Sequence, residues 1–477
     1  MMTTSYGVSA SAIASVFVLS IVLVFIISGD LSSLMCFDTW KSEFTVPIVL
    51  LQTKITGASN EFRAVFSERS NATTGFSVNS RFRNRTVIRE EVRGSEQGLA
   101  RARAAIRKAA SSGKLSSNVR DHGDVLAGDI YRNPGAFYQS YVEMERRFKV
   151  YVYEEGDPPI VHDGPCKDIY TTEGRFIHEM EYGKSGFRTW DPHRAHVYFM
   201  PFSVTWMVKY LYKPLSYDLG PLRDFVSDYV KVISTKHPFW NRTHGADHFM
   251  LSCHDWGPHA SQGNSILYNT SIRVLCNANS SEGFNPQKDV TLPEIHLYSG
   301  NIPPKLLSTS PPSPSPRPHL AFFSGGLHGP IRPTLLHYWK NRDPDLLVYE
   351  YLPNNLDYYT LMLQSKYCLC PSGHEVASPR IVEAIYAECV PVILSDHYVL
   401  PFSDVLRWEA FSLQVGVLEI PRLKEVLMAV PEEKYVRLTE GLRGVRRHFV
   451  LNQPAKRFDV FHMILHSVWL RRINSRL

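Results

Sequence analysis

A nearly continuous apolar run from Ala10 to Ser28 opens the hydrophobic pattern of this 477-residue chain. The run is long enough to span a bilayer as a helix. It exceeds the apolar core of a typical signal peptide, and Leu31-Ser32-Ser33 makes a poor cleavage site, so an uncleaved anchor is expected. No Lys or Arg precedes the run, so the positive-inside rule says little about orientation. We predict a cytosolic tail over residues 1–9 and a transmembrane signal-anchor over residues 10–28.

Residues 29–125 are polar, rich in Ser and Arg, and without regular hydrophobic spacing except at 96–110. That piece, EQGLARARAAIRKAA, predicts a helix with a basic face. A solvated stalk helix is favoured over a nucleic-acid or lipid contact. We therefore predict a flexible stem over residues 29–125.

From residue 126 onward, short apolar runs alternate with amphipathic stretches. The apolar runs predict strands at 148–153, 195–200, 247–253, 272–275 and 290–292. An amphipathic helix is predicted at 221–236. Alternating strands and helices favour a mostly parallel sheet, so residues 126–307 are predicted to form a first Rossmann-like domain.

A proline- and serine-rich stretch, STSPPSPSPRP at 308–318, predicts a linker. Beyond it, strands are predicted at 319–323, 346–351, 367–371, 390–394 and 412–417, with helices at 356–366, 380–388 and 420–430. We predict a second domain over residues 319–445 and C-terminal helices over residues 446–477 that pack on the body. The expected fold class is α/β, with two facing domains and a ligand cleft between the carboxyl ends of their strands.

The segment from Lys366 to Asp396 carries the clearest candidate chemistry. A buried strand leads into a loop with Ser372 and Gly373, and then into a helix with Ser378 as the predicted N-cap. Such a strand–loop–helix unit directs backbone N–H groups at whatever lies above the loop. It therefore predicts an anion site, and phosphate is the usual ligand.

Charged residues in this segment suit a ligand that has both phosphates and hydroxyl groups. Arg380 lies in the first helical turn, where the helix dipole disfavours a cation that serves no anion. Glu375 and Glu383 could accept hydrogen bonds from sugar hydroxyls. The alternative is an ordinary α/β unit with a capped helix and a surface ion pair.

The net charge of +6 is unevenly distributed. Between Gln52 and Arg120 the chain has fourteen Lys and Arg, five Glu and no Asp, a net charge of +9, so the rest of the chain has −3. A nucleic-acid-binding body is not supported.

Cysteines and glycosylation sequons bear on the compartment. The seven cysteines leave at least one unpaired, Cys253 and Cys276 are the preferred disulfide, and Cys368 and Cys370 are expected to be buried apolar residues. Five Asn-x-Ser/Thr sequons support a lumenal body, at Asn71, Asn84, Asn241, Asn269 and Asn279.

Four stretches resemble a known family: FFSGGLHGPIR, GADHFMLSCHDWGPH, RVLCNAN and the run from Lys366 to Phe402. They resemble the exostosin-type glycosyltransferases, specifically their plant cell-wall branch, and the similarity extends from about Asp129 to Trp469. The resemblance implies a type II Golgi membrane protein with a stem and a lumenal GT-B body. It also implies inverting transfer of a hexose or pentose from a UDP-sugar to a cell-wall polysaccharide or glycan, and complexes with other glycosyltransferases.

The resemblance makes the segment from Lys366 to Asp396 the donor site. It implies that Glu383 holds the ribose and that Glu375 faces the donor sugar. Arg380 and the loop with Ser372 and Gly373 would hold the pyrophosphate, with help from Gly325, Gly326 and Arg332. The sequence departs from the family at Glu388, where a glycine usually forms a left-handed helix cap.

Inverting transfer needs a base to take the acceptor proton and positive charge on the leaving diphosphate. His254 and Asp255, at the end of a predicted strand, are the candidates for the base, with His162 and Asp163 in reserve. For each of these residues the alternative is a polar turn or a buried hydrogen-bonded pair. His193 and His196 are expected to be structural.

Asp343-Pro344-Asp345 has the form of a metal-binding Asp-x-Asp motif, but Asp-Pro favours a surface turn. No metal site and no cofactor are predicted. Activity should therefore be insensitive to a chelator, and EDTA inhibition reversed by manganese would contradict this.

Two other function classes compete with this hypothesis. A catalytically silent homologue could act as a structural partner in a polysaccharide synthase complex. Glu388 favours that alternative weakly, and the intact Ser372, Arg380 and Glu383 argue against it. A secreted carbohydrate-binding module is disfavoured by the uncleaved anchor and by two full α/β domains.

Overall fold

The structure is a computed structural model of the whole chain, and it describes residues 94, 96–111, 129–307 and 317–475. The chain divides into a unit of residues 1–94 and a unit of residues 95–477, and the account below concerns the second. The predicted cytosolic tail and anchor, residues 1–28, lie outside the described ranges. Within those ranges no helix has both the length and the apolar character needed to cross a bilayer.

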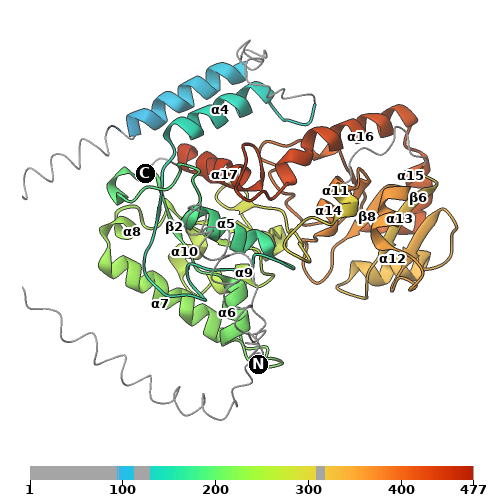
Figure 1. Cartoon of the computed structure of the whole chain (residues 1–477), viewed down its shortest axis with the longest axis horizontal. Helices are drawn as coiled ribbons and strands as arrows, with labels where there is room; N and C mark the ends of the chain where they lie inside the picture. The colour runs from blue at the N-terminus through green and yellow to red at the C-terminus, as the bar shows by residue number, and fades with distance from the viewer. Residues whose placement is uncertain (1–93, 95, 112–128, 308–316, 476–477) are drawn as a thin grey trace, which may run out of the picture. The chain divides into compact units, whose positions relative to one another are not determined.

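Five short parallel strands form the first sheet in the order β1-β2-β3-β4-β5. They are β1 (Val150–Val152), β2 (Val197–Met200), β3 (His248–Ser252), β4 (Ile272–Leu275) and β5 (Val290–Thr291). The associated helices are α4 (Pro134–Arg147), α5 (Thr171–Tyr182), α6 (Val204–Leu211), α7 (Gly220–Lys236), α8 (Pro238–Thr243), α9 (Gly257–Ser261) and α10 (Ser265–Asn269) (Figure 1).

Both faces of this first sheet are buried. Tyr198 and Met200 join a hydrophobic cluster with residues of α7, whereas Val197 and Phe199 join a cluster with residues of α5. Because successive strand residues point to opposite faces, helices must cover both sides. This explains why the strands are continuous apolar runs rather than alternating ones.

The second sheet is also parallel, in the order β10-β9-β8-β6-β7. Its strands are β6 (His319–Ser324), β7 (Leu346–Tyr349), β8 (Ser365–Pro371), β9 (Val390–Leu394) and β10 (Leu413–Gln414). The later helices are α11 (Pro304–Leu307), α12 (Ile331–Trp339), α13 (Tyr358–Gln364), α14 (Arg380–Tyr386), α15 (Leu423–Met428), α16 (Glu432–Val445) and α17 (Val460–Asn474). The chain goes from β6 to β7 on one side and returns to β8 on the other, which makes the β6–β8 boundary a topological switch point.

The predicted α/β class with two parallel sheets is confirmed, and the two sheets are consistent with a GT-B-like arrangement. One predicted element differs in type. Residues Val417–Arg422 form a 3-10 helix that contains Pro421, and α15 begins only after it. Proline lacks the N–H that an α-helix would need inside this stretch, which accounts for the difference.

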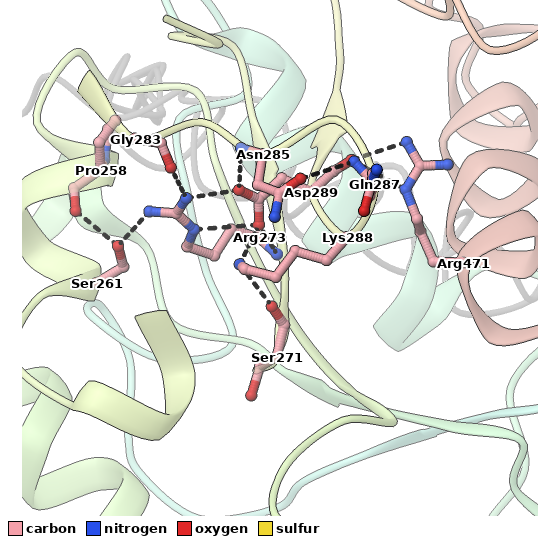
Figure 2. A network of polar contacts seen from close by, with 10 residues as sticks. All are labelled: Pro258, Ser261, Ser271, Arg273, Gly283, Asn285, Gln287, Lys288, Asp289 and Arg471. Carbon is pink, nitrogen blue, oxygen red and sulfur yellow. Dashed lines mark hydrogen bonds and ion pairs between the residues drawn. The ribbon is translucent and has the colours of Figure 1, made fainter. Parts of the chain in front are cut away.

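Helix α17 returns from the second sheet to pack on the first, where it contacts β4 and β5. Figure 2 shows one polar network at this junction, centred on the buried ion pair between Arg273 and Asp289. Arg273 also donates to the Gly283 carbonyl at 2.7 Å, and Arg471 of α17 donates to the Asp289 carbonyl at 2.8 Å. Because every partner is matched, removing one charge would leave the other buried and unpaired. The network therefore fixes the β4–β5 connection against α17.

The stalk helix expected near residues 96–110 needs a correction. Residues 96–111 are helical, but Leu99 and Ala102 are completely buried. Glu96 pairs with Arg472, and Arg103 donates to the carbonyls of Ile473 and Ser475. The apolar face of this helix therefore packs beside α17 rather than standing in solvent. The sequence did not indicate this packing because its arginines suggested a solvent-facing basic surface. Arginine can also donate to the exposed carbonyls at a helix end, as Arg103 does here.

Helix α14 ends at the position where the family pattern expects glycine. Glu388 has φ of +51°, so the backbone is left-handed although the residue is not glycine. Its carboxylate accepts a hydrogen bond from Arg443 Nε at 2.9 Å. The helix end therefore keeps the expected cap geometry. Its cost is the steric strain of a side chain at positive φ.

We expect Glu388→Gly to relieve this strain. In an Arg443→Ala background, which removes the ion pair first, Glu388→Gly should raise the free energy of unfolding by about 1 kcal/mol. Urea denaturation of the two variants measures the difference. An unchanged or lower value would mean that Glu388 is not strained.

Candidate functional site

The carboxyl ends of β3, β4 and β5 lie next to one another at one edge of the first sheet. Residues that follow these ends directly are polar: Asp255 after β3, Asn277 after β4 and Glu294 after β5. In a parallel sheet this edge is where ligands bind. Sequence reasoning named only Asp255 of the three.

Glu173, in the first turn of α5, holds the loops that follow β2 and β3. Its Oε1 accepts hydrogen bonds from Ser203 Oγ at 2.5 Å and from Thr205 N at 2.9 Å. Its Oε2 accepts from Cys253 N at 2.8 Å. The side chain is fully buried, so these partners stabilise the carboxylate away from water. Nothing in the sequence singled out Glu173, because its partners come from distant segments.

His254 is held as a neutral hydrogen-bond donor. Its Nδ1 accepts from Trp256 N at 3.0 Å, so the proton of the neutral ring lies on Nε2. Its ring packs against Tyr170 at a centroid distance of 4.8 Å, and burial lowers the pKa of His254 to about 4. The only lone pair is engaged, which makes His254 a poor proton acceptor.

Asp255 is better suited than His254 to accept a proton. Burial raises the pKa of Asp255 above its ordinary value, while a hydrogen bond from Tyr170 and the nearby His374 oppose the rise. A carboxylate with a raised pKa is a stronger base than one in water. Of the two predicted candidates, the geometry favours Asp255.

Asn277 connects the two sheets at this edge. Its Nδ2 donates to the Asp255 carbonyl at 3.1 Å and to Glu375 Oε2 at 2.6 Å. Glu375 belongs to the loop after β8, in the second sheet. The amide therefore brings two sequence-predicted site residues, 120 positions apart, to the same place.

The switch point of the second sheet holds two arginines. Arg380 Nη2 donates to the Ser324 carbonyl at the end of β6 at 2.6 Å, and its guanidinium lies 4.7 Å from the centre of the Phe323 ring. Arg332 comes from α12. Burial, with the charge of Arg380, lowers the pKa of Arg332 to about 10. Arg332 and Arg380, both predicted site residues, therefore lie close enough for their charges to interact.

Several N–H groups of these arginines have no hydrogen-bond partner among the described residues. They are Arg332 Nε and Arg380 Nε and Nη1, all buried. Glu383 near Arg380 and Glu294 near Arg332 offset part of this positive charge, but the unsatisfied donors still lack acceptors. The pair therefore has the chemistry of a site for a multiply charged anion.

Glycines let the loops come close to the arginines. A Cβ at Gly325 would lie 3.0 Å from Arg380 Nη2, and one at Gly373 would lie 3.1 Å from Arg332 Nη2. Gly329, which the sequence reasoning did not name, has φ of +66°, and a Cβ there would lie 1.7 Å from the Gly373 carbonyl. Gly326 is less crowded, since its nearest atom would be His328 Nε2 at 3.5 Å.

The predicted cap of α14 is wrong in detail. Pro379 occupies the N-cap position, and no side chain caps the helix. Ser378 is buried and accepts from Ile381 N through its carbonyl, and Ser372 Oγ lies 3.4 Å from the Val376 carbonyl. Gly373 N donates to the Glu375 carbonyl at 3.0 Å. These groups shape the loop, so positive charge at the site comes from the arginines more than from the seven-residue helix.

Glu383 lies on α14, close to Arg380. Tyr358 Oη donates to Glu383 Oε2 at 3.0 Å. Burial raises the pKa of Glu383, and Arg380 and the Tyr358 hydrogen bond oppose the rise. The carboxylate is therefore held between Tyr358 and the charge of Arg380.

Glu294 is a site residue that sequence reasoning missed. It is 4% exposed, and burial raises its pKa well above the ordinary value, an effect to which Asp255 adds and which Arg332 opposes. It therefore lies near groups of both sheets. The available signal was its position just after a predicted strand, behind Pro293.

The acidic groups of this site should make stability depend on pH. Burial, with Glu282 and Asp255 nearby, raises the pKa of Glu375 from 4.5 to about 7. The unfolded state then ionises first, so the contribution is present below pH 4.5 and is lost as the pH rises to 7. We expect the melting temperature to fall over this range less steeply in Glu375→Gln than in the wild type.

The matched control for this experiment is Glu432→Gln, an exposed glutamate on α16. It should keep the wild-type slope. Equal slopes in Glu375→Gln and the wild type would show that Glu375 titrates normally.

The remaining sequence candidates have structural partners. His162 Nδ1 lies 2.7 Å from Glu181 Oε1, and Asp163 Oδ1 accepts from Gly164 N. His196 is buried and accepts from Lys149 N, and the His193 ring packs edge-on against Phe239. These contacts agree with the structural role expected for the two scattered histidines.

Both carboxylates of the Asp-x-Asp stretch form ion pairs with a lysine. Lys424 Nζ lies 2.7 Å from Asp343 Oδ2 and 3.0 Å from Asp345 Oδ2. A cation is therefore already present between the two carboxylates.

The cysteine predictions were partly right. The Cys253–Cys276 disulfide is confirmed, and it joins the ends of β3 and β4 beneath the site. Cys370 is buried and free. Cys368 was expected to be an apolar core residue, but it forms a disulfide with Cys389, because the chain returns in β9 directly beside β8.

Comparison with known proteins agrees with this geometry. Residues 144–430 match the Exostosin GT47 domain. The chain is 57% identical to a probable glycosyltransferase of Arabidopsis thaliana over 96% of both chains, and 56% identical to a second one over 80% of this chain and 81% of the relative. It is 29% identical to a probable beta-1,4-xylosyltransferase of Arabidopsis thaliana over 68% of this chain and 82% of the relative. The chain therefore belongs to the exostosin GT47 family of glycosyltransferases.

Proposed function

We propose that this protein transfers a sugar from a UDP-sugar to a cell-wall polysaccharide or glycan, with inversion at the anomeric carbon. The observation that carries the proposal is the pair Arg332 and Arg380 at the switch point, whose buried Nε atoms, with Arg380 Nη1, find no partner in the part of the chain that the structure describes. A diphosphate has the charge and the acceptor oxygens to satisfy them. Gly325 and Gly373 let their loops approach both guanidinium groups closely.

Carboxylates around the arginines suit the rest of a nucleotide-sugar. In this proposal Glu383, held by Tyr358, accepts hydrogen bonds from the ribose. Glu375, held by Asn277, contacts the donor sugar. Each carboxylate is oriented by one partner, which reduces the entropy lost when the ligand binds.

In the proposed reaction an acceptor hydroxyl attacks the anomeric carbon from the face opposite the diphosphate. The new glycosidic bond forms as the bond to UDP breaks. Asp255 takes the hydroxyl proton, and the two arginines stabilise the charge that develops on the leaving UDP. Since protein cations meet this charge, we expect the reaction to proceed without a divalent metal.

The lumenal location is part of the same proposal. Two disulfides, Cys253–Cys276 and Cys368–Cys389, suit an oxidising compartment. Asn241 and Asn269 are exposed and could accept glycans. We propose a single-pass type II protein of the Golgi membrane, anchored by residues 10–28, with its body in the lumen.

A donor panel tests the proposal. The purified protein is incubated with UDP-glucose, UDP-galactose, UDP-glucuronic acid, UDP-xylose and UDP-arabinose, together with wall oligosaccharides. UDP release identifies the donor, and NMR of the product reports the anomeric configuration. We expect turnover of one donor class, with inversion.

Two results would count against the proposal. Absence of UDP binding would favour the silent structural partner described above. A product that retains the donor configuration would exclude single-step attack assisted by Asp255. The left-handed geometry of Glu388 removes the main sequence argument for the silent partner, because the helix cap forms without glycine.

A further inference from the structure

A row of aromatic rings leads away from Asp255 toward solvent. Tyr170 hydrogen-bonds Asp255, and its ring packs on His254 at 4.8 Å. His254 contacts Trp256 at 5.4 Å, and Trp256 contacts Tyr212 at 4.7 Å. We call the four rings of Tyr170, His254, Trp256 and Tyr212 the aromatic track.

The outer end of the track lies on an exposed loop. Tyr212 Oη is 3.1 Å from the backbone N of Tyr217, whose side chain is 84% exposed. Leu215, on the same loop, is also 84% exposed. Large apolar side chains grouped at one exposed place are typical of binding surfaces.

Helix α6 borders the track and has unused polar groups. Thr205 N and His254 N bind the two oxygens of the same carboxylate, Glu173, so the start of α6 lies beside the loop of His254. Thr205 Oγ1 and Trp206 Nε1 are buried and have no hydrogen-bond partner among the described residues. Rings next to unsatisfied donors are the combination that a sugar chain requires.

We propose that the aromatic track binds the acceptor as a chain of pyranose residues, with the reacting hydroxyl at Asp255. The C–H face of a pyranose carries partial positive charge and packs on the negative face of an aromatic ring. The polar rim of the sugar can then meet hydroxyl and indole groups. This proposal rests on the proposed function for the identity of the reaction, but sugar binding by the track can be measured without it.

The aromatic track begins at Asp255, and this favours a glycan over a protein partner. A partner protein on Leu215 and Tyr217 would have no need of rings that run inward to the partly buried carboxylate of Asp255. An acceptor chain must reach that carboxylate with one end and extend into solvent with the other. The track provides such a path.

The test measures binding of xylo-, cello-, manno- and galacto-hexaose to the full-length protein by calorimetry, without nucleotide. We expect one of them to bind, and Trp256→Ala and Tyr212→Ala to weaken its binding about tenfold each. Tyr212→Phe keeps the ring and should keep most of the affinity. Tyr217→Ala should also weaken binding, and because this side chain is 84% exposed its removal should leave the melting temperature unchanged.

Trp190→Ala is the matched control, because Trp190 is 69% exposed but precedes β2, at the opposite edge of the sheet. It should leave oligosaccharide binding unchanged. Failure of all four oligosaccharides to bind, or equal affinity in the wild type, Tyr212→Ala and Tyr217→Ala, would overturn the proposal. Oligosaccharide binding that depends on the track in a protein without UDP-sugar turnover would instead contradict the proposed function alone.

Discussion

Arg380→Ala should weaken UDP binding by about 100-fold or more. Arg380 Nε and Nη1 have no hydrogen-bond acceptor by geometry among the described residues, although Tyr358 and Glu383 lie close, and charge-assisted hydrogen bonds to a phosphate contribute about 1.5–3 kcal/mol each. Isothermal titration of UDP measures the loss. Arg380→Lys keeps the charge but not the planar fork, so it should recover only part of the affinity.

Arg332→Ala separates binding from folding. Arg380 also holds the Ser324 carbonyl, so its loss can disturb the end of β6. The repulsion between the two cations, in contrast, is a cost of the free protein that Arg332→Ala relieves. We expect this variant to lose UDP affinity while its melting temperature stays the same or rises.

An exposed arginine provides the control for both variants. Arg422, which pairs with Glu419 and Glu425 on the surface, can be changed to alanine without effect on UDP binding. A large fall in melting temperature for Arg332→Ala, with UDP affinity unchanged, would show that the pair is structural.

Asp255→Asn should reduce kcat by about 10²- to 10⁴-fold, the range that general base catalysis contributes. Asparagine keeps the shape and can accept from Tyr170, but it cannot take a proton. UDP affinity should change by less than about twofold, because Asp255 follows β3 of the first sheet, whereas the arginines lie on α12 and α14 beside the second. Steady-state kinetics with the donor and acceptor found by the panel measure the change.

The pH profile gives a second measure of this role. The pKa of Asp255 is raised, so kcat of the wild type should rise with pH through that raised value and then level off. The rise should be absent in Asp255→Asn. Asp163→Asn makes the same change after β1 and should leave kcat unchanged, and a similar loss in both variants would argue for a general loss of charge instead.

Local sequence was sufficient to predict individual strands. The runs at β2 and β9 are continuously apolar because both faces of each strand are buried, and such runs can be recognised without knowledge of their neighbours. The strand predicted at 412–417 is longer than β10 because polar strands at a sheet edge give only a weak hydrophobic pattern from which to place their ends. The burial of the helix at 96–111 was missed because its partner, α17, lies more than 350 residues away.

The same division between local pattern and distant contacts applies to the candidate site residues. Arg380, Glu383 and Gly373 could be named because they share one strand–loop–helix segment. Glu173 and Asn277 could not, because their hydrogen-bond partners come from loops distant in sequence. The choice between His254 and Asp255 also needed the structure, since it depends on a hydrogen bond from Trp256 N to the His254 ring.

The sequence alone indicated the class of fold, the Cys253–Cys276 pairing and the segment on which the donor chemistry is expected, whereas the linker at 308–318 stays a prediction. The class of fold and the donor segment depend on local pattern, which hydrophobic spacing and residue type encode directly. The tertiary structure decided the strand order that makes β6 and β8 a switch point, and it brought Arg332 to Arg380 and Glu375 to Asn277. Strand order and packing depend on how much apolar surface the two sheets bury in total. That quantity depends on the whole chain and cannot be read from any single stretch.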